Sequence, residues 1–235
     1  MRNIDVCLSP ELIHQYELKG KIVVVVDILR ATSCMVSGLA TGVAAIKPLA
    51  DVDICKGLKQ EGYFTAGERN GSKVEGFDMG NSPFEYMEPH LKGQKVAVTT
   101  TNGTLAIEKS KTADQIVIGA FLNLSAVAKY IQQQDKDVVV VCAAWKGKVN
   151  LEDSLFAGAL VERLATSHQP ECDVPRMMVK LYQVEKNDLF TFVKESSHAR
   201  RLNKLDVFKD IEFCVQEDQF DIVPVLKEGH LVLAG

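Results

Sequence analysis

The sequence has no long apolar run and no excess of positive charge. A membrane-spanning helix needs roughly 20 consecutive apolar residues, but no apolar run approaches that length, and the candidate Ile22 to Val26 ends at Asp27. The chain carries 27 Lys and Arg against 31 Asp and Glu, so its formal net charge is −4 and no overall positive field is present to hold a polyanion. We therefore expect neither a membrane protein nor a nucleic-acid-binding protein.

The sequence also has no C-x-x-C pair, and its six cysteines are scattered, most of them in apolar segments where a free thiol behaves as a small hydrophobic side chain. Disulfides and a zinc cluster are not expected. The first residues show neither the apolar core of a secretory signal nor the Arg- and Ser-rich character of a transit peptide. With 46% hydrophobic and 25% charged residues in 235, the chain has globular composition, and we expect it in the cytoplasm.

Three common catalytic motifs are missing as well: H-x-x-x-H, G-x-S-x-G and G-x-G-x-x-G. Their absence disfavours a zinc hydrolase, a serine hydrolase and a dinucleotide-binding enzyme.

Short β-branched runs alternate with amphipathic stretches as far as about Leu164. The predicted strands are nearly continuous in Val or Ile, as expected for strands buried on both faces, and are Ile22–Asp27, Lys95–Thr99, Gln115–Gly119 and Val138–Ala143. The predicted crossover helices have apolar residues at intervals of three and four, and are Ala31–Thr41, Asn102–Lys111, Ser125–Gln134 and Leu151–Ala165. This alternation predicts an α/β protein with a three-layer α/β/α sandwich.

The remaining segments are less regular. The stretch from Gly67 to Pro89 is rich in Gly, Asn, Ser and Pro and is long for a connection, which is typical of a functional loop. A helical pattern runs from about Val174 to Ala199, and the apolar stretch Asp210 to Val215 is predicted to add an edge strand. No linker or repeat divides the chain, so we expect a single domain over residues 1–235 with a helical and edge-strand part from about residue 170.

Polar residues follow the predicted strands at their carboxyl ends, where open α/β sheets bind ligands. After the first strand, Asp27 and Arg30 precede a helix that begins near Thr32. A carboxylate, an Arg and free helix N–H groups suit a metal ion beside a phosphate. Alternatively, Thr32 only caps the helix and Asp27 pairs with Arg30.

The Gly-rich loop supplies a second group of candidates. Glu68 can bind a hard cation and Arg69 can grip an oxyanion with two hydrogen bonds, while Asn81 and Ser82 offer neutral hydrogen bonds. The alternative is a solvated Ω-loop whose charges have no function.

A third group is the run Thr100, Thr101, Asn102 and Gly103, which resembles an oxyanion cradle at a strand end. It has no Lys at the Walker spacing, so a nucleotide P-loop is not supported. The β-propensity and capping preference of threonine explain the run equally well.

Two further groups lie on predicted helices. Glu152 and Asp153 open a helix, where acidic residues stabilise the helix dipole in any protein; in the functional interpretation, they face the same crevice and complete a carboxylate set for Mg²⁺. His198, Arg200 and Arg201 form either an exposed basic helix face or an anion clamp over the site.

Taken in order, D-I-L-R-A-T-S, G-E-R-N-G, G-F-D-M-G-N-S-P, T-T-T-N-G-T and L-E-D-S-L-F-A-G resemble the 2-phosphosulfolactate phosphatase family, and the likeness extends through S-S-H-A-R-R-L and D-I-E-F-C. The resemblance implies a Mg²⁺-dependent phosphomonoester hydrolase that converts (2R)-2-phospho-3-sulfolactate to (2R)-3-sulfolactate and phosphate, a step in coenzyme M biosynthesis. It also implies a mixed, mostly parallel sheet. The chain departs from the pattern at Ala144, Ala199 and Asp206, where the family is expected to favour glycine.

On this basis we expect Mg²⁺ to neutralise the phosphoryl oxygens while a water attacks in line. The expected catalytic residues are Asp27, Glu68, Glu152 and Asp153, with Asp27, Glu68 and Asp153 as metal ligands. The expected substrate-binding residues are Arg30, Thr32, Arg69, Asn81, Ser82, Thr100, Thr101, Asn102, Gly103, His198, Arg200 and Arg201. A second mechanism makes Asp27 the nucleophile, as in haloacid-dehalogenase-type phosphatases, but the second Asp of those enzymes is replaced here by Leu29.

Two other functions stay open: a phosphatase of another small 2-phospho-carboxylic acid, and a non-catalytic anion-binding module with the same fold. The acidic residues argue against the module, because an anion receptor gains nothing from carboxylates unless a cation lies between. The expected partner is a small phosphorylated anion. Homodimers are common among small enzymes of this kind, and the sequence leaves the oligomeric state open.

Overall fold

The strands of the computed structural model, which describes residues 1–202 and 207–235, belong to one mixed sheet. Their bounds are β1 Arg2–Cys7, β2 Ile22–Val26, β3 Ala45–Pro48, β4 Phe64–Arg69, β5 Ser72–Lys73, β6 Lys95–Thr99, β7 Gln115–Gly119, β8 Val138–Cys142, β9 His168–Pro170, β10 Pro224–Lys227 and β11 His230–Leu233. Their order across the sheet is β5-β4-β6-β3-β11-β10-β7-β2-β8-β1-β9.

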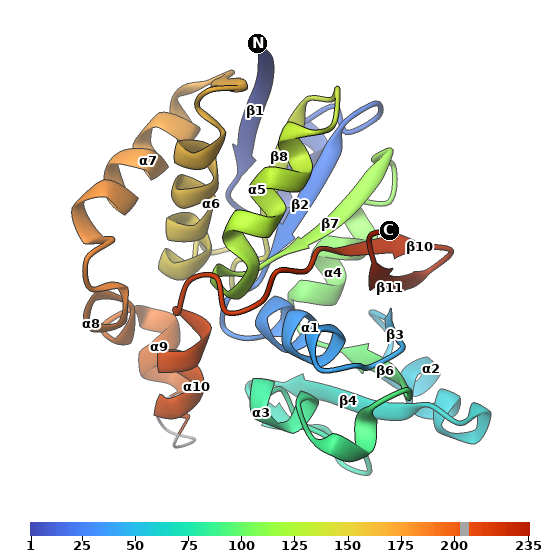
Figure 1. Ribbon diagram of the computed structural model, residues 1–235. Coiled ribbons are helices and arrows are strands. Elements are labelled where there is room, and N and C mark those ends of the chain that lie inside the picture. Colours follow the sequence, from blue (N-terminus) through green and yellow to red (C-terminus); the bar gives the residue numbers. More distant parts are fainter. Residues whose placement is uncertain (203–206) are drawn as a thin grey trace.

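Helices cover the sheet on both sides (Figure 1). Their bounds are α1 Ala31–Ala40, α2 Val52–Gly57, α3 Pro83–Tyr86, α4 Gly103–Lys109, α5 Leu124–Gln132, α6 Leu151–Leu164, α7 Asp173–Glu185, α8 Leu189–Lys194, α9 Ser197–Leu202 and α10 Phe208–Cys214. In Figure 1, α5 and α6 lie in front of the sheet and α4 lies behind β7. The predicted α/β fold with a mixed, mostly parallel sheet flanked by helices is confirmed. No helix in the described parts of the chain has both the length and the apolar character to cross a bilayer.

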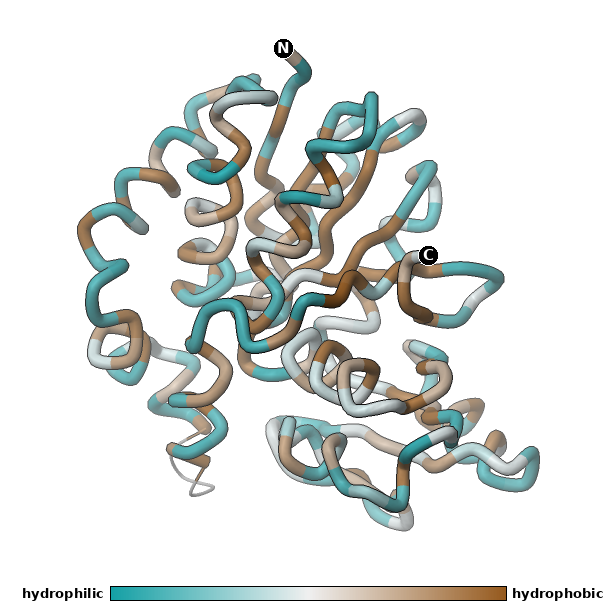
Figure 2. The backbone as a smooth tube through the Cα atoms, viewed as in Figure 1, coloured by the Kyte–Doolittle hydropathy of each residue, from teal (hydrophilic) through white to brown (hydrophobic). Residues whose placement is uncertain are grey.

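The central strands are buried because their residues are apolar on both faces. All five residues of β2 are fully buried, and β2 runs parallel to β8 with Val24 opposite Val140. β-Branched side chains pack well on such a pleated surface. In a helix their χ1 rotamers are restricted, which lowers their helix propensity. Figure 2 shows these strands as a continuous hydrophobic layer inside more hydrophilic helices and loops.

The C-terminal region differs from the sequence prediction in two ways. The stretch Asp210 to Val215 lies mainly in helix α10 and is not an edge strand: Ile211 and Cys214 are buried three residues apart, and a window this short does not separate the two periodicities. The strands that do follow, β10 and β11, lie in the interior of the sheet, between β7 and β3. The predicted helical stretch from Val174 to Ala199 is broken into α7, α8 and α9, with Asp188 capping α8.

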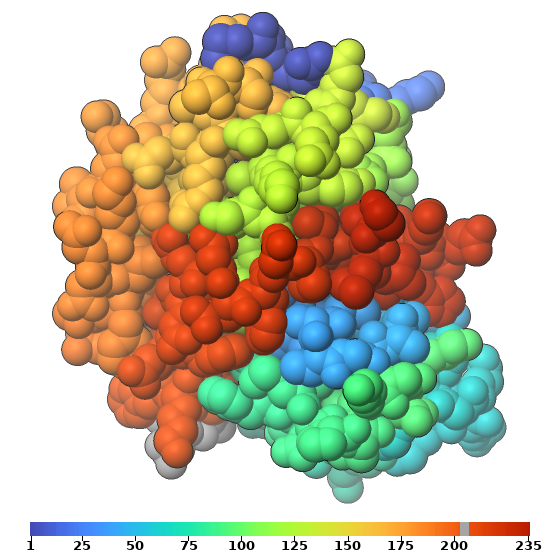
Figure 3. Space-filling model, viewed as in Figure 1, coloured from blue at the N-terminus to red at the C-terminus, as the bar shows by residue number. Residues whose placement is uncertain are grey.

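The β10–β11 hairpin reverses the strand direction in the middle of the sheet, because it is antiparallel to both neighbours. Each of these outer pairings comprises a single residue pair, Val225 with Val117 and Leu231 with Ile46. Strand twist accumulates across the sheet, and in Figure 1 β4 crosses the lower part of the view at a steep angle to β2 and β8. The chain therefore brings the loops that follow β2, β4, β6 and β8 to one cavity. Figure 3 shows the red C-terminal segment lying against α1, in blue.

Candidate active site

A narrow cavity lies where the loops after β2, β4, β6 and β8 meet helix α9. About 300 Å³ of the space there is free of protein atoms, part of it open to solvent. Its polar and aromatic lining residues are Asp27, Arg30, Glu68, Asn81, Asn102, Trp145 and His198. All of these except Trp145 are at most 8% exposed. Residues from five separate sequence motifs therefore share one largely buried site.

Asp27 lies directly after β2 and against the first turn of α4. Its backbone N–H donates to the hydroxyl of Thr32 over 3.0 Å, which fixes the turn into α1. A Cβ added to Gly103 would lie 2.8 Å from Asp27 Oδ2, so the carboxylate and this glycine are in close contact. Burial raises the pKa of Asp27 to about 6; His198 opposes this rise, and the Glu68 and Glu152 carboxylates add to it.

Glu68, at the end of β4, is the second carboxylate of the cavity. Its Oε1 accepts the backbone N–H of Thr101 and its Oε2 accepts the backbone N–H of Gly71, both over 2.7 Å. These bonds join the loop after β4 to the loop after β6 and hold the carboxylate in one orientation. Glu68 and Asp27 therefore offer two oxygen donors to the same small volume.

His198 reaches the cavity from helix α9, with Glu152 of α6 behind it. The distance from His198 Nδ1 to Glu152 Oε1 is 2.6 Å, and Glu152 is fully buried. The His198 ring packs on Trp145, with ring centroids 5.5 Å apart. Since Nδ1 faces Glu152, Nε2 is the ring nitrogen left for a ligand, and in the described part of the chain it has no hydrogen-bond partner.

Arg30 lies between the cavity and helix α10. Its Nη1 is paired with Asp210 Oδ2, and the hydroxyl of Ser82 donates to Asp210 Oδ1 over 3.0 Å. The suggested pairing of Arg30 with Asp27 is therefore replaced by one with Asp210. Asp210 is not among the site residues predicted from the sequence, where its only signal is the D-I-E-F-C segment of the family resemblance.

Asp153 has a different position from its neighbour Glu152. Its carboxylate accepts the backbone N–H of Ile28 over 2.9 Å and of Ala144 over 3.2 Å, so it ties the loop after β2 to the loop after β8. Burial, followed by repulsion from Glu152, raises its pKa well above the usual range. Asp153 does not line the cavity, and its role as a metal ligand stays a prediction.

Other predicted binding residues have their polar groups occupied within the fold. Arg69 points toward β6, where its guanidinium donates to the carbonyl of Glu68 over 2.7 Å and to the hydroxyl of Thr99 over 2.9 Å. The hydroxyl of Thr100 accepts the backbone N–H of Thr104 and so caps helix α4. None of these side chains lines the cavity.

The basic residues of α9 point in different directions. Arg200 is exposed, whereas the Arg201 guanidinium lies 4.9 Å from the centre of the Trp145 ring.

The loop after β6 holds two further predicted residues. Thr101 has a buried hydroxyl without a partner among the described residues, and Asn102 accepts the backbone N–H of Lys146 over 3.2 Å. Of the three departures from the family pattern, Asp206 lies outside the described residues.

Ala144 has a φ of 57°, in the left-handed region that favours glycine. This conformation costs an L-residue about 1–2 kcal/mol, and part of the gain from glycine is offset by the entropy of the unfolded chain. We expect Ala144→Gly to raise the free energy of unfolding by about 0.5–1 kcal/mol in urea titrations. Ala143→Gly is the control and should destabilise, because Ala143 has no positive φ; an Ala144→Gly variant that is less stable than the parent would contradict this account.

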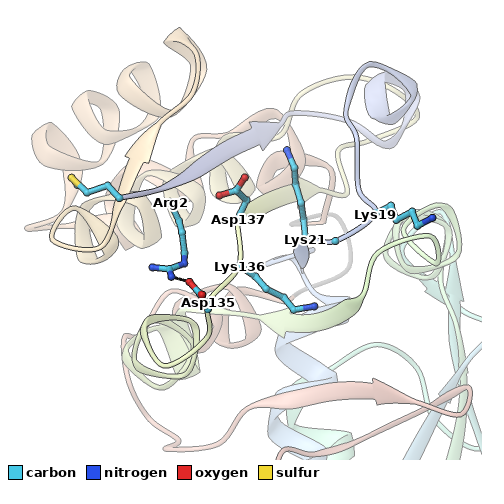
Figure 4. Close-up of a pocket in the computed structure, with 8 residues that line it drawn as sticks. Arg2, Lys19, Lys21, Asp135, Lys136 and Asp137 are labelled. Atoms are coloured by element: carbon cyan, nitrogen blue, oxygen red, sulfur yellow. Dashed lines mark ion pairs between the residues drawn. The ribbon is translucent and has the colours of Figure 1, made fainter.

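A larger cavity lies at the opposite, amino ends of β1, β2 and β8 (Figure 4). Acidic side chains accompany its cations: Arg2 pairs with Asp135, and Lys136 Nζ lies 2.5 Å from Asp114. Its charges are thus largely neutralised within the fold, and the carboxylate-lined cavity is the better candidate for an active site.

The donor set of the carboxylate-lined cavity fits magnesium. In residues 1–202 and 207–235, no group of three or more His, Cys, Asp or Glu side chains is arranged to hold a metal by itself. The cavity does offer the Asp27 and Glu68 carboxylates and a buried amide oxygen, Asn81 Oδ1, that has no hydrogen-bond partner among the described residues. Mg²⁺ takes few protein ligands and completes its shell with water and phosphate oxygens, so such an incomplete oxygen set is suitable.

Comparison with known proteins gives one consistent family. A family model described as 2-phosphosulpholactate phosphatase matches residues 7–229. A protein of Caldanaerobacter subterraneus subsp. tengcongensis, named probable 2-phosphosulfolactate phosphatase, is 42% identical over 222 residues, which cover 92% of each chain. Proteins with the same name from Thermotoga maritima and Clostridium tetani are 40% identical over 230 residues and 35% identical over 231 residues. Each of these two matches covers at least 97% of both chains.

Proposed function

The chain belongs to the 2-phosphosulfolactate phosphatase family, and we propose that it hydrolyses (2R)-2-phospho-3-sulfolactate to (2R)-3-sulfolactate and inorganic phosphate with Mg²⁺ as cofactor. One observation carries the proposal: Asp27 and Glu68 share a buried cavity with Arg30, Asn102 and His198. Two carboxylates beside cationic and amide groups suit a cation and the anion that it binds.

The net charge of the substrate agrees with this arrangement. Phosphosulfolactate carries a phosphate, a sulfonate and a carboxylate, and the protein is acidic overall. Positive charge must therefore be gathered locally, and the Arg30 guanidinium, which Asp210 orients, brings it to the cavity. When bound, Mg²⁺ supplies further positive charge that neutralises the phosphoryl oxygens.

Four side chains of the cavity have chemical tasks in this scheme. Asp27 and Glu68 would hold the metal, with Asn81 Oδ1 as a neutral oxygen donor. Arg30 stabilises the charge that spreads over the phosphoryl oxygens. A water attacks the phosphorus in line.

Proton transfer in this scheme falls to His198. Because Nδ1 of His198 is bound to Glu152, Nε2 can take a proton from the attacking water or give one to the leaving oxygen. Glu152 is buried behind the ring and acts through it, which replaces the direct contact with substrate or metal that the sequence suggested.

We expect phosphate release to stop when EDTA removes divalent cations and to return when Mg²⁺ is added. The assay measures inorganic phosphate from (2R)-2-phospho-3-sulfolactate, with 2-phospholactate and phosphoglycolate as alternative substrates. Full activity in EDTA would contradict the role of Mg²⁺ as cofactor. Faster phosphate release from phosphoglycolate would contradict the assignment of phosphosulfolactate as the substrate. Binding of all three compounds without phosphate release would show an anion-binding module.

A further inference from the structure

The carboxylate-lined cavity is adjoined by a second, more open cavity, and the two share Arg30, Gly71 and Asn81 as a common wall. The second cavity is also lined by Ser82, Glu85, Asp210 and Lys73. We propose that this second cavity binds the sulfonate of the substrate and that Lys73 selects for it. The inference rests on the proposed function and adds which part of the substrate is recognised, and by which residue.

The charges of the second cavity single out Lys73. The Asp210 carboxylate is occupied by Arg30 and the Ser82 hydroxyl, and the Glu85 carboxylate accepts the backbone N–H of Gly80. Lys73 has no ion pair within the described residues, and its closest polar contact is the carbonyl of Asp78, at 3.5 Å from Nζ. Of the two cations that line this cavity, Arg30 and Lys73, only Lys73 has no ion pair among the described residues; the Glu85 carboxylate, which likewise has none, lies in the same cavity.

The common wall carries two polar atoms that need a ligand. Arg30 Nε and Asn81 Oδ1 are both buried and have no hydrogen-bond partner in the described chain, and the residues are only 5% and 8% exposed. A buried polar group without a partner costs roughly 1–3 kcal/mol. Since Nη1 of Arg30 is held by Asp210, the Nε side of its planar fork is the part left for an anion. Of these two atoms only Arg30 Nε is a donor that can bind an anion; Asn81 Oδ1 is an acceptor and stays the neutral oxygen proposed for the metal.

The local register explains how one hairpin supplies both cavities. Glu68 of β4 lies directly opposite Lys73 of the short antiparallel strand β5. Side chains of such a cross-strand pair project to the same side of the sheet. On that side, the Glu68 carboxylate lines the first cavity and the Lys73 side chain lines the second. The phosphate and sulfonate of phosphosulfolactate are on adjacent carbons, so a molecule with its phosphate in the first cavity has its sulfonate near the wall that the two cavities share.

The test compares two substrates that differ at the sulfonate, (2R)-2-phospho-3-sulfolactate and 2-phospholactate, with Lys73→Gln. A charge-assisted contact of this kind corresponds to about a tenfold change in affinity. We expect KM for the sulfonate substrate to rise about tenfold, with kcat within about twofold of the parent and the kinetics on 2-phospholactate unchanged. Lys73→Arg should restore most of the affinity, and Lys56→Gln, which removes an exposed charge that lines neither cavity, should change nothing.

The outcomes separate the inference from the proposed function. An unchanged KM in Lys73→Gln, or equal losses on both substrates, would overturn the sulfonate site while leaving the phosphatase assignment intact. A parent enzyme that hydrolyses both substrates with the same kcat/KM would also overturn the sulfonate site and leave the phosphatase assignment intact. A parent enzyme that releases no phosphate from the sulfonate substrate would instead overturn the proposed function.

Discussion

Replacing Asp27 by Asn is expected to abolish phosphate release and, at the same time, to make the metal-free protein more stable. Activity should fall by about three orders of magnitude or more, because the variant loses a charged metal ligand and the cation that holds the phosphate. Stability should rise because the native fold buries this carboxylate next to Glu68 and Glu152. Asn has nearly the same shape and no charge to bury.

The sign of the stability change follows from the pKa of Asp27, which burial raises from 3.8 to about 6. Between these pH values the native state binds more protons than the unfolded state, so stability falls as the pH rises and then levels off above about pH 6. At neutral pH the penalty that Asn removes is about 1–3 kcal/mol. The gain should shrink as the pH falls toward 4, where the native carboxyl is already neutral.

Urea titrations in EDTA at several pH values measure this gain, and a phosphate-release assay measures the loss of activity. Asp221→Asn, at an exposed position, is the matched control and should change neither quantity. Added Mg²⁺ should stabilise the parent more than the variant, since a ligand that binds only the native state raises its stability. An Asp27→Asn variant that kept its activity would exclude the metal site; an inactive variant that was less stable in EDTA would contradict the electrostatic account.

The central strands could be predicted from the sequence because their burial is written into their composition. β2 and β8 are nearly continuous in Val, and few other structures accommodate such runs. β10 and β11 have four residues each, and their place in the sheet depends on single residue pairs with β7 and β3. No local pattern encodes such a long-range insertion, so the interior hairpin was not predictable.

In the candidate site, too, local sequence predicted some features and long-range contacts decided others. The sequence predicted that Asp27 and Asn102 follow buried strands and that Glu68 belongs to a functional loop. It did not predict how they gather, because β4 and β6 run opposite to β2 and β8 across the inserted hairpin. Spacing did not show that adjacent residues of α6 diverge, with Glu152 turned to His198 and Asp153 turned to two backbone N–H groups. Those directions are decided by which donors the other loops present, and this information is not local to the motif.

Gly103→Ala provides the second large expected effect, because it tests whether the contact between α4 and Asp27 is required. A Cβ at this position would lie 2.8 Å from Asp27 Oδ2 and 2.8 Å from the methyl group of Ala31. Neither atom is the end of a long flexible side chain, so Asp27 or the first turn of α4 must move. We expect kcat/KM to fall at least about a hundredfold, since small displacements of catalytic groups are costly, and stability to fall by about 1–3 kcal/mol from overpacking.

Helix propensity makes the opposite prediction for this substitution, which is why the experiment is decisive. Alanine is better than glycine by about 1 kcal/mol in a helix interior and by less at the first residue of a helix, where Gly103 lies, so without the contact Gly103→Ala would leave the protein as stable or slightly more stable. Gly57→Ala in α2 is the matched control, because a Cβ there meets nothing within 4 Å, and it should be as stable as the parent or more so. If both variants gained stability and kept full activity, then α4 would not press on Asp27, and the compact arrangement of carboxylates from which the mechanism was built would be wrong.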